Sequence, residues 1–203
     1  MRYRQTPRRD FLITGSALVA LGGMAGPRRA RAQGTSVLRV LCTGPAGSIP
    51  DIVARRYAEQ LAIQHRGAVV VDNRPGAAGR IAVAALKQAD GDGMTMLLAQ
   101  GAIATVYPYL YEKLGYDAAI DLKPVSIAAE AMLGLAVGPA VPAAVGNLRE
   151  LVDWTRAHPK LANYGSPGAG TLPHLLSALL ATTAKEDWQH VAYAGGPQAL
   201  VDL

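Results

Sequence analysis

The sequence predicts an α/β protein with mainly parallel sheets, on three observations. From residue 36 onward, short apolar runs alternate with longer runs of helical periodicity, which is the pattern of consecutive strand–helix–strand units. Two of the expected strands run into loops rich in glycine and proline that lead directly into a helix. Half of the 203 residues are hydrophobic, so a chain of this length has enough apolar surface for a buried core.

The first strand and helix are expected between residues 37 and 67. The apolar run VLRVLCT (37–43) predicts a strand, and GPAGSIP after it predicts a loop. Asp51 then opens a helix, at a position where an acidic capping side chain is favoured. Gly67 follows the end of the helix as a stop signal. The side chains expected on the buried face recur at helical spacing: Val53, Ala54, Tyr57, Ala58, Leu61 and Ala62.

The next elements repeat this order. AVVVD (68–72) predicts a second strand, and the loop NRPGAAG leads from it into an alanine-rich helix over 80–89. The glycines of DGDG end that helix. MTMLLAQ (94–100) predicts a third strand, which enters another glycine-containing loop at Gly101.

The second half of the chain begins with a stretch of no clear period, 105–125, which we interpret as a connection between two lobes. Residues 126–139 form an apolar run typical of a strand. Residues 147–150 (NLRE) fit a capping box, in which Asn147 and Glu150 bond each other's backbone N–H groups at the start of a helix. Strands are expected again at 161–165 (LANYG) and 188–194 (WQHVAYA). These elements divide the chain into a first lobe, 36–104, and a second, 105–203.

The formal charge of +5 does not indicate a nucleic-acid partner, because the excess of basic residues lies in the first 32 residues. Seven arginines and one acid occur there, in the layout of an export signal: a basic segment ending in Arg8-Arg9, an apolar stretch, and a small-residue site that predicts cleavage before Gln33. The paired arginines resemble a twin-arginine signal, although Pro7 departs from that pattern and Sec export stays open. A membrane anchor is the alternative, but the apolar stretch is shorter than a membrane span.

Enzymatic, metal and nucleotide sites have little support. Cys42 is the only cysteine, so no internal disulfide can form, and its strand position suits a core thiol. An enzyme would recruit Cys42 as nucleophile with His174 or His190 as base. No group of residues has metal-ligand spacing. The loop 165–171 has the glycine spacing of a phosphate-binding loop but lacks its lysine. We therefore expect no catalytic residue, no metal and no cofactor.

The two loops at 40–52 and 162–175 share one arrangement: strand, Gly/Pro loop, helix start. Helix N-termini present backbone N–H groups with no partner inside the helix, and glycine lets the backbone approach a ligand closely. Together, two such loops could hold a small carboxylate at the micromolar level, about −8 kcal/mol. The alternative is that each is only a βα turn, with Asp51 or Thr171 as the N-cap.

At these loops the sequence resembles the substrate-binding proteins of tripartite tricarboxylate transporters, also called Bug receptors. The resemblance covers residues 37–203 and rests on several motifs in one order. They are GPAGSIPDIVAR, VVVDNRPGAAGRIAVAALKQADGDGMTMLLA, YPYLYEKLGYDAAIDLKPVS, LRELVDWTRAHPKLANYGSPGAGTLPHL and HVAYAGGPQALVDL.

The resemblance implies a periplasmic binding protein of type II: two α/β lobes that close on a small organic acid, which is passed to the membrane permease of a tripartite transporter or to a sensor. It implies an exported, periplasmic protein that is a monomer and binds no nucleic acid. By position, the implied ligand-binding residues are Gly44, Ala46, Gly47, Ser48, Asp51, Gly101, Ala102, Ser166, Gly168, Ala169, Gly170, Thr171, His174 and Tyr193. Asp51 is also a candidate helix cap, and Tyr193 a candidate core residue.

The chain departs from the family in two ways. Residues 43–46 (TGPA) stand where the family commonly has an aromatic residue and paired prolines, and Ala192 and Ala194 where it commonly has Pro and Lys. Family members are also longer, so we expect a truncated chain in which the second lobe and the return to the first lobe are incomplete. Two alternatives to a carboxylate receptor stay open: an exported α/β enzyme acting on an acyl or phosphoryl substrate, and a truncated remnant that binds nothing.

Overall fold

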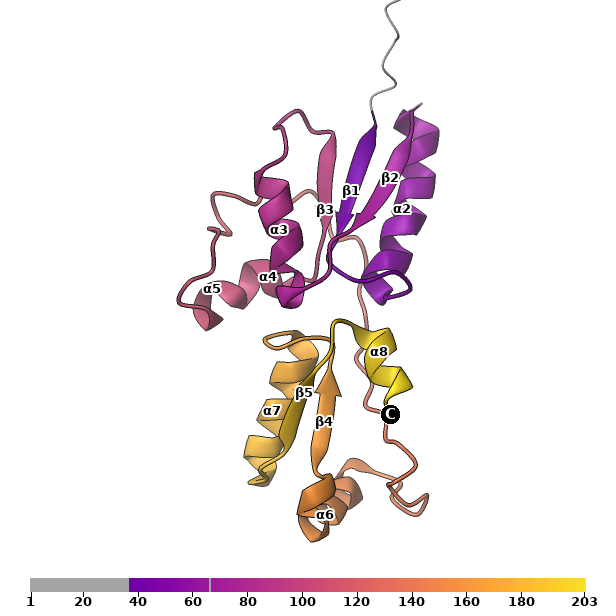
Figure 1. Cartoon of the computed structure of the whole chain (residues 1–203), viewed down its shortest axis with the longest axis vertical. Coiled ribbons are helices and arrows are strands. Elements are labelled where there is room, and N and C mark those ends of the chain that lie inside the picture. The colour runs from indigo at the N-terminus through magenta and orange to yellow at the C-terminus, as the bar shows by residue number, and fades with distance from the viewer. Residues whose placement is uncertain (1–36, 66) are drawn as a thin grey trace, which may run out of the picture. The chain divides into compact units, whose positions relative to one another are not determined.

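The computed structural model describes residues 37–65 and 67–203. The described residues contain two parallel sheets flanked by helices (Figure 1). The predicted α/β class with parallel sheets is therefore confirmed. The export signal expected in residues 1–32, with cleavage before Gln33, lies outside the described residues.

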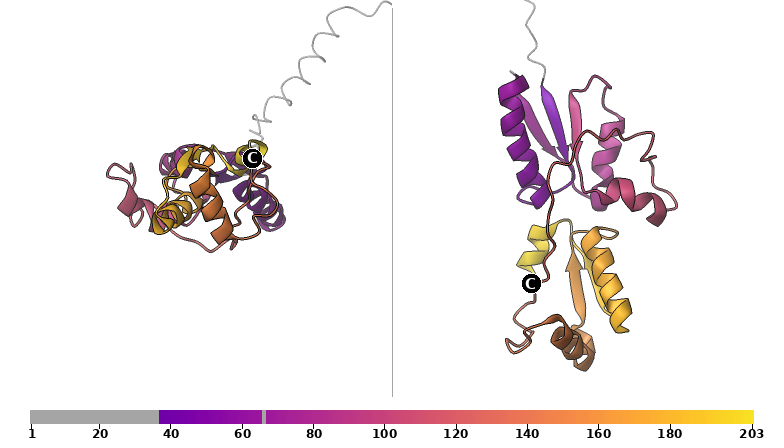
Figure 2. Two further views of the ribbon diagram at one scale, coloured as in Figure 1. Left: turned by 90° about the horizontal axis from the view of Figure 1, so that it is seen from below. Right: turned by 180° about the vertical axis from the view of Figure 1, so that it is seen from behind.

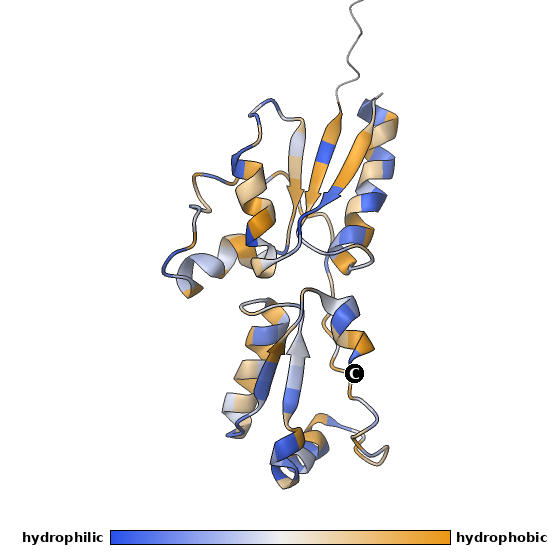
Figure 3. Ribbon diagram, viewed as in Figure 1, coloured by the Kyte–Doolittle hydropathy of each residue, from blue (hydrophilic) through white to orange (hydrophobic). Residues whose placement is uncertain are grey.

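The first sheet has three parallel strands in the order β2-β1-β3. They are β1 (Leu38–Cys42), β2 (Val69–Asn73) and β3 (Thr95–Leu98), so all three predicted strands are confirmed with slightly shorter bounds. The central strand β1 is buried except for Arg39 and is largely hydrophobic, as a strand covered on both faces must be (Figure 3). All three strands end at the same edge of the sheet.

Two helices cover this sheet. Helix α2 (Ile49–His65) packs against β1 and β2, and helix α3 (Arg80–Lys87) packs against β1 and β3 (Figure 2). The buried core against α2 is made by Val40, Cys42 and Ala54, with partly buried Leu61, Val69, Val71 and Leu98 around them. Helix α2 begins two residues before Asp51, the predicted opening residue, so Asp51 lies in its first turn.

The predicted connection at 105–125 is partly helical. The short helices α4 (Ala102–Thr105) and α5 (Tyr107–Leu110) follow β3, and a 3-10 turn, η1 (Ala77–Gly79), precedes α3. Residues as far as Leu122 pack against a buried cluster of Val83, Ala102, Ile103 and Tyr107. Periodicity did not reveal these helices because four residues make only about one helical turn.

The second sheet pairs β4 (Asn163–Ser166) with β5 (Gln189–Ala192) in parallel, which confirms both predicted strands. Helices α7 (Leu172–Ala184) and α8 (Gly196–Val201) pack against β4 (Figure 1).

Helix α6 (Leu148–Ala157) precedes this sheet and is followed by a 3-10 turn, η2 (Pro159–Leu161). The predicted cap is confirmed at Asn147, whose Oδ1 accepts the Glu150 N–H at 3.0 Å. The Glu150 carboxylate bonds the N–H of Gly146 at 2.7 Å, one residue earlier than a capping box predicts.

The strand predicted over 126–139 is wrong. This segment has no helix or strand, and its apolar side chains are exposed, Met132 at 98% and Ile127 at 78%. An apolar run becomes a strand only where a neighbour accepts its backbone hydrogen bonds, and no other described strand pairs with it. Among the described helices, none has the length and apolar character of a membrane span.

Candidate ligand-binding loops

The first loop, 44–48, connects the carboxyl end of β1 to α2. Its turn is closed by Ser48, whose hydroxyl donates to the Pro45 carbonyl at 2.6 Å and whose N–H donates to the same oxygen at 3.1 Å. Gly47 has φ +78°, a left-handed conformation that favours glycine. Gly44 is buried, and a Cβ there would collide with the Ser48 hydroxyl. The predicted residues Gly44, Gly47 and Ser48 therefore define the shape of this loop.

Asp51 holds the first loop in place through hydrogen bonds to its buried carboxylate. Its side chain is only 4% exposed, and its carboxylate accepts hydrogen bonds from the Gly47 N–H at 2.9 Å, Arg55 Nε at 3.0 Å and Asn73 Nδ2 at 2.9 Å. Asn73 Nδ2 also donates to the Gly44 carbonyl at 2.9 Å. The hydrogen bond from Arg55, the largest cause, lowers the pKa of Asp51 to about 2. Asp51 is thus a buried anion already satisfied by the chain.

The second loop, 166–171, connects the carboxyl end of β4 to α7. Gly168 and Gly170 have φ +143° and +82°, so both need glycine. The Gly168 carbonyl accepts the Thr171 hydroxyl at 2.7 Å and the Thr171 N–H at 3.2 Å. Ser166 is only 1% exposed. Its hydroxyl oxygen lies 3.1 Å from the Gly168 carbonyl oxygen and 3.4 Å from the Gly168 nitrogen.

Two imidazole rings lie behind the second loop. Nδ1 of His174 accepts the Gly170 N–H at 3.1 Å, and Nε2 of His190 lies 2.8 Å from the Ser166 hydroxyl. The ring centroids are 4.0 Å apart, and the Tyr164 ring lies 5.0 Å from His190 and 6.3 Å from His174. Burial, followed by repulsion from His174, lowers the pKa of His190. His174, a predicted ligand contact, is therefore attached to its own loop through Nδ1.

Most glycine N–H groups of the two loops already have partners within the chain. Gly47, Gly168 and Gly170 donate to Asp51, Ser166 and His174. By contrast, Ala46 and Ala169, the exposed alanines of the first and second loops, have no N–H partner among residues 37–65 and 67–203. The sequence predicted amide donors in these loops, and the structure leaves the two alanine amides without a partner in the described part of the chain, at exposed positions, one in each loop.

The remaining predicted residues lie at less open positions. Gly101 is exposed, but Ala102 is 9% exposed and belongs to the buried cluster with Tyr107. The backbone N–H of Tyr193 donates to the Ser166 carbonyl at 2.9 Å. The Tyr193 ring covers Gly165, where a Cβ would lie 2.9 Å from Cε2. Burial, followed by a hydrogen bond with Asp202, raises the pKa of Tyr193.

A third loop, which sequence reasoning did not identify as part of the site, adjoins the second. Ala77 and Ala78 have φ +46° and +55°, an uncommon conformation for alanine. The Ala78 carbonyl accepts the Tyr107 hydroxyl at 3.0 Å. A Cβ on Gly168 would lie 3.5 Å from the Ala78 Cβ. The sequence identifies NRPGAAG as the loop before α3 without giving it a ligand role, and a non-glycine residue at positive φ has no sequence signal.

Arg80 and Tyr111 were also missed. The Arg80 guanidinium lies 4.0 Å from the centre of the Tyr111 ring, in a cation–π arrangement. The Tyr111 hydroxyl donates to the Ala169 carbonyl at 3.0 Å. A positive charge is thus connected to the second loop through one aromatic ring. Only the fold brings α3, the end of α5 and this loop together, because they are far apart in sequence.

Neither candidate nucleophile is open to a substrate. Cys42 is fully buried, and burial, as the largest cause, raises the pKa of its thiol, which opposes the thiolate that reacts. Ser166 and His190 have the hydrogen bond of a nucleophile–base pair, but Ser166 is 1% exposed. No group of metal-ligating side chains occurs in the part of the chain that the structure describes.

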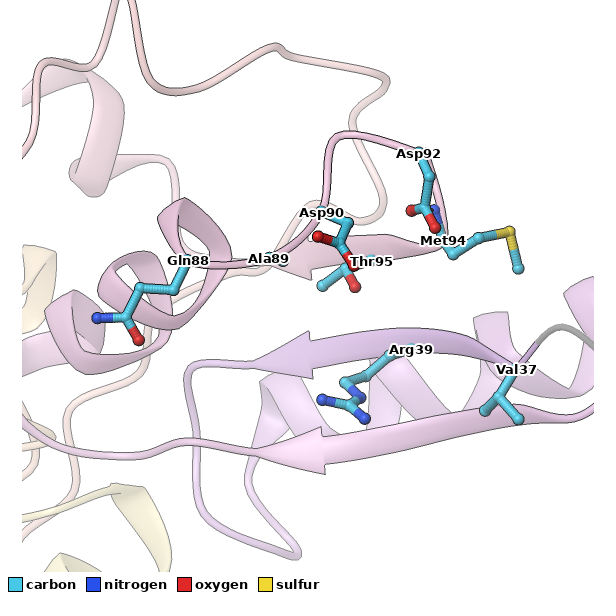
Figure 4. Close-up of a pocket in the computed structure, with 8 residues that line it drawn as sticks. All are labelled: Val37, Arg39, Gln88, Ala89, Asp90, Asp92, Met94 and Thr95. Carbon is cyan, nitrogen blue, oxygen red and sulfur yellow. The ribbon is translucent and has the colours of Figure 1, made fainter.

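A pocket of about 220 Å³ lies away from both loops, at the opposite ends of β1 and β3 (Figure 4). Arg39, Asp90 and Asp92 are the charged residues in its lining. None of the predicted site residues lines it. Two carboxylates against one guanidinium do not suit an anionic ligand, so the pocket does not compete with the loops as a carboxylate site.

Comparison with known proteins places the chain in a family. A sequence model described as "Tripartite tricarboxylate transporter family receptor" matches residues 53–203. A UPF0065 protein of Bordetella bronchiseptica is 33% identical over 192 residues, which are 95% of this chain and 56% of that protein. The chain thus spans little more than half the length of such relatives.

Solved structures agree. The chain is similar to "R. palustris Rpa4515 with adipate", with a TM-score of 0.72 and 26% identity, covering 82% of this chain and 55% of the other. It is also similar to "periplasmic binding protein BugD", with a TM-score of 0.66, 26% identity and the same coverage. The fold expected from the sequence, that of a periplasmic binding protein, is confirmed.

Proposed function

This chain belongs to the tripartite tricarboxylate transporter receptor family, and from that premise we propose that it binds a small organic carboxylate through the N–H groups of Ala46 and Ala169. The observation that carries the proposal is that these two N–H groups have no hydrogen-bond acceptor within the described residues. They lie at exposed positions, and each sits in a loop that is otherwise fixed by its own hydrogen bonds.

Rigid loops suit this task energetically. A backbone N–H bonded to a carboxylate contributes about 1.5–3 kcal/mol, and the N-termini of α2 and α7 add about 0.3–1 kcal/mol each. Because the loop glycines are already bonded to Asp51, Ser166 and His174, little conformational entropy is lost when a ligand binds. Together these contributions come to about 4–8 kcal/mol, and their upper end corresponds to binding at the micromolar level, about −8 kcal/mol.

The charges near the loops favour the same ligand class. The Asp51 anion is paired with Arg55 at 3.0 Å, so in this proposal Asp51 shapes the first loop and does not touch the ligand. Arg80, stacked on Tyr111, places a positive charge one aromatic ring away from the Ala169 carbonyl, which the Tyr111 hydroxyl bonds. The solved relative with adipate supports a small dicarboxylate as the first ligand to test.

The wider setting is proposed with the ligand. In this proposal residues 1–32 direct export to the periplasm, residues 36–104 and 105–203 belong to two lobes, and the bound acid passes to a membrane permease or a sensor. The protein acts as a monomeric receptor and not as an enzyme. The family match and the BugD neighbour support this setting.

Amide chemical shifts test the proposal directly. Adipate is titrated into the uniformly ¹⁵N-labelled chain at pH 8, with affinity measured in parallel by calorimetry. The N–H signals of Ala46 and Ala169 should move most, while that of Gly93, an open turn glycine away from the loops, should stay still. Saturable binding that shifts the pocket residues of Figure 4 and leaves both alanine amides unchanged would show that the loops are not the site.

The enzyme alternative needs a separate assay. We expect no hydrolysis of acyl or phosphoryl ester substrates by the chain. Turnover that is lost in Cys42→Ala, His174→Ala or Ser166→Ala would replace the receptor proposal with catalysis at that residue. Loss of adipate binding in His174→Ala without any turnover supports the receptor.

A further inference from the structure

The imidazole pair behind the second loop, His174 and His190, has a consequence beyond holding the loop. Nδ1 of His174 receives a hydrogen bond from the backbone N–H of Gly170 at 3.1 Å. A backbone N–H can only donate, so Nδ1 must carry a lone pair, and the neutral ring holds its proton on Nε2. Protonation of Nδ1 would place two N–H groups against each other and break this contact.

The neighbouring ring of His190 makes protonation of the His174–His190 pair unfavourable. Its ring is 4.0 Å from that of His174, and its Nε2 bonds the buried hydroxyl of Ser166 at 2.8 Å. The third ring in contact with the pair, Tyr164 on β4, is uncharged in the neutral range. No carboxylate, lysine or arginine contacts either imidazole in the described part of the chain. Nothing nearby therefore compensates a proton added to the pair.

The two rings act on adjacent parts of one loop. His190 fixes Ser166, which in turn bonds Gly168, while His174 fixes Gly170. Ala169 lies between these two glycines. We propose that His174 and His190 are positioning residues that hold the Ala169 amide for the ligand only while His174 is neutral, so that acidification releases the second loop and weakens carboxylate binding. This inference rests on the proposed function.

The sharpest variant is His174→Asn. The Oδ1 of asparagine takes the place of Nδ1 as an acceptor for Gly170 and cannot be protonated in this pH range. His174→Leu removes the acceptor entirely. His158→Gln is the matched control, since His158 is an exposed histidine stacked on Trp154 with its Nδ1 2.8 Å from the Trp154 carbonyl, away from both loops.

Adipate affinity is measured for each protein from pH 8 to pH 5.5 by calorimetry. Because adipate itself gains protons over this range, the comparison is between proteins at equal pH. As the pH falls from 8 to 5.5, the dissociation constant should rise in every protein. The rise should be about three- to tenfold larger for the unsubstituted chain and for His158→Gln than for His174→Asn, as expected for loss of one hydrogen bond. His174→Leu should bind weakly throughout, and His174→Asn should recover part of that loss. Equal pH profiles for the unsubstituted chain and His174→Asn would overturn the proposal.

A ligand-free measurement separates this inference from the proposed function. In the unsubstituted chain, the Gly170 N–H signal should titrate between pH 8 and pH 5, the range in which imidazoles gain protons, and it should not do so in His174→Asn. Long-range ¹⁵N–¹H spectra at pH 8 should show Nδ1 of His174 unprotonated, a result that needs no variant to fold. A protonated Nδ1 there, or a Gly170 signal that titrates equally in His174→Asn, contradicts the proposal. If adipate does not bind at any pH, the receptor proposal fails while these spectra still decide the role of His174.

Discussion

The two strand-to-helix loops have similar sequences, but different chemistry holds them in place. The first loop is anchored by a buried carboxylate: Asp51 accepts from Gly47, Arg55 and Asn73. The second is anchored by neutral groups, with Ser166 and His174 as its partners. An ionised anchor gives stronger hydrogen bonds, whereas a neutral imidazole is lost on mild acidification. One loop is therefore built for rigidity across a wide pH range, and the other responds to pH.

The largest effect is expected at the carboxylate of the first loop. Asp51→Ala should lower the free energy of unfolding by about 3 kcal/mol, because it removes the buried carboxylate that accepts three hydrogen bonds, from Gly47, Arg55 and Asn73. Urea denaturation measures this change. Glu59→Ala is the control on the same helix, since the Arg56–Glu59 pair is exposed and should contribute no more than about 0.5 kcal/mol. Equal losses in the two variants would mean that Asp51 does not anchor the loop.

Alanine at matched glycines sharpens the comparison. In Gly170→Ala the new Cβ would lie 2.5 Å from the Tyr111 hydroxyl and 2.9 Å from Leu110 Cδ2, at φ +82°. Strain and crowding together should cost about 2 kcal/mol. Gly47→Ala has open space around it at φ +78°, so only the backbone conformation costs energy, about 1 kcal/mol. Thermal melts of both variants check this order, and a larger loss for Gly47→Ala would contradict it.

The serines of the two loops give a smaller difference. The Ser166 hydroxyl lies within hydrogen-bond distance of Gly168 and His190, whereas that of Ser48 bonds only Pro45. Ser166→Ala should therefore destabilise by about 1–2 kcal/mol and Ser48→Ala by about 1 kcal/mol. Urea titrations at pH 8 compare them. If Ser48→Ala proves the more costly, the contact with His190 contributes little.

The smallest effect concerns pH. Folding lowers the pKa of His190, so its contribution to stability is present above about pH 6.5 and is lost as the pH falls below that value. Folding lowers the pKa of Asp51 to about 2, so its contribution is present above about pH 4 and is lost as the pH falls through 2. Unfolding free energy measured from pH 8 to 2 should decline first in a step that becomes smaller in His190→Gln. A first step of equal size in His190→Gln would assign it to another group.

Much of the fold was predictable because local patterns and tertiary packing agree. Each strand of the described residues, β1 to β5, was expected from a short apolar run that leads into a glycine-containing loop or turn. The strand expected over 126–139 failed because an apolar run needs a hydrogen-bonding neighbour, which a sequence pattern does not supply. The helices α4 and α5 were missed because one turn shows no periodicity.

For the candidate site, sequence identified the loops but not which atoms remain open. Glycine spacing drew attention to Gly47, Gly168 and Gly170, yet their N–H groups are used to shape the loops. Ala46 and Ala169, whose side chains carry no chemistry, present the open amides. Hydrogen-bond partners depend on which segments the fold brings together. Asn73 bonds Asp51, and His190 bonds Ser166, across more than 20 residues of sequence in each case.

Local patterns were enough to predict the α/β class, the strands β1 to β5 and the two strand-to-helix loops, because apolar periodicity and glycine placement act over a few residues at a time. Long-range packing alone makes Asp51 a buried anchor, brings the rings of His174 and His190 into contact, and lets Tyr111 join Arg80 to Ala169. These contacts join residues distant along the chain, and their burial and charge depend on every segment that packs around them.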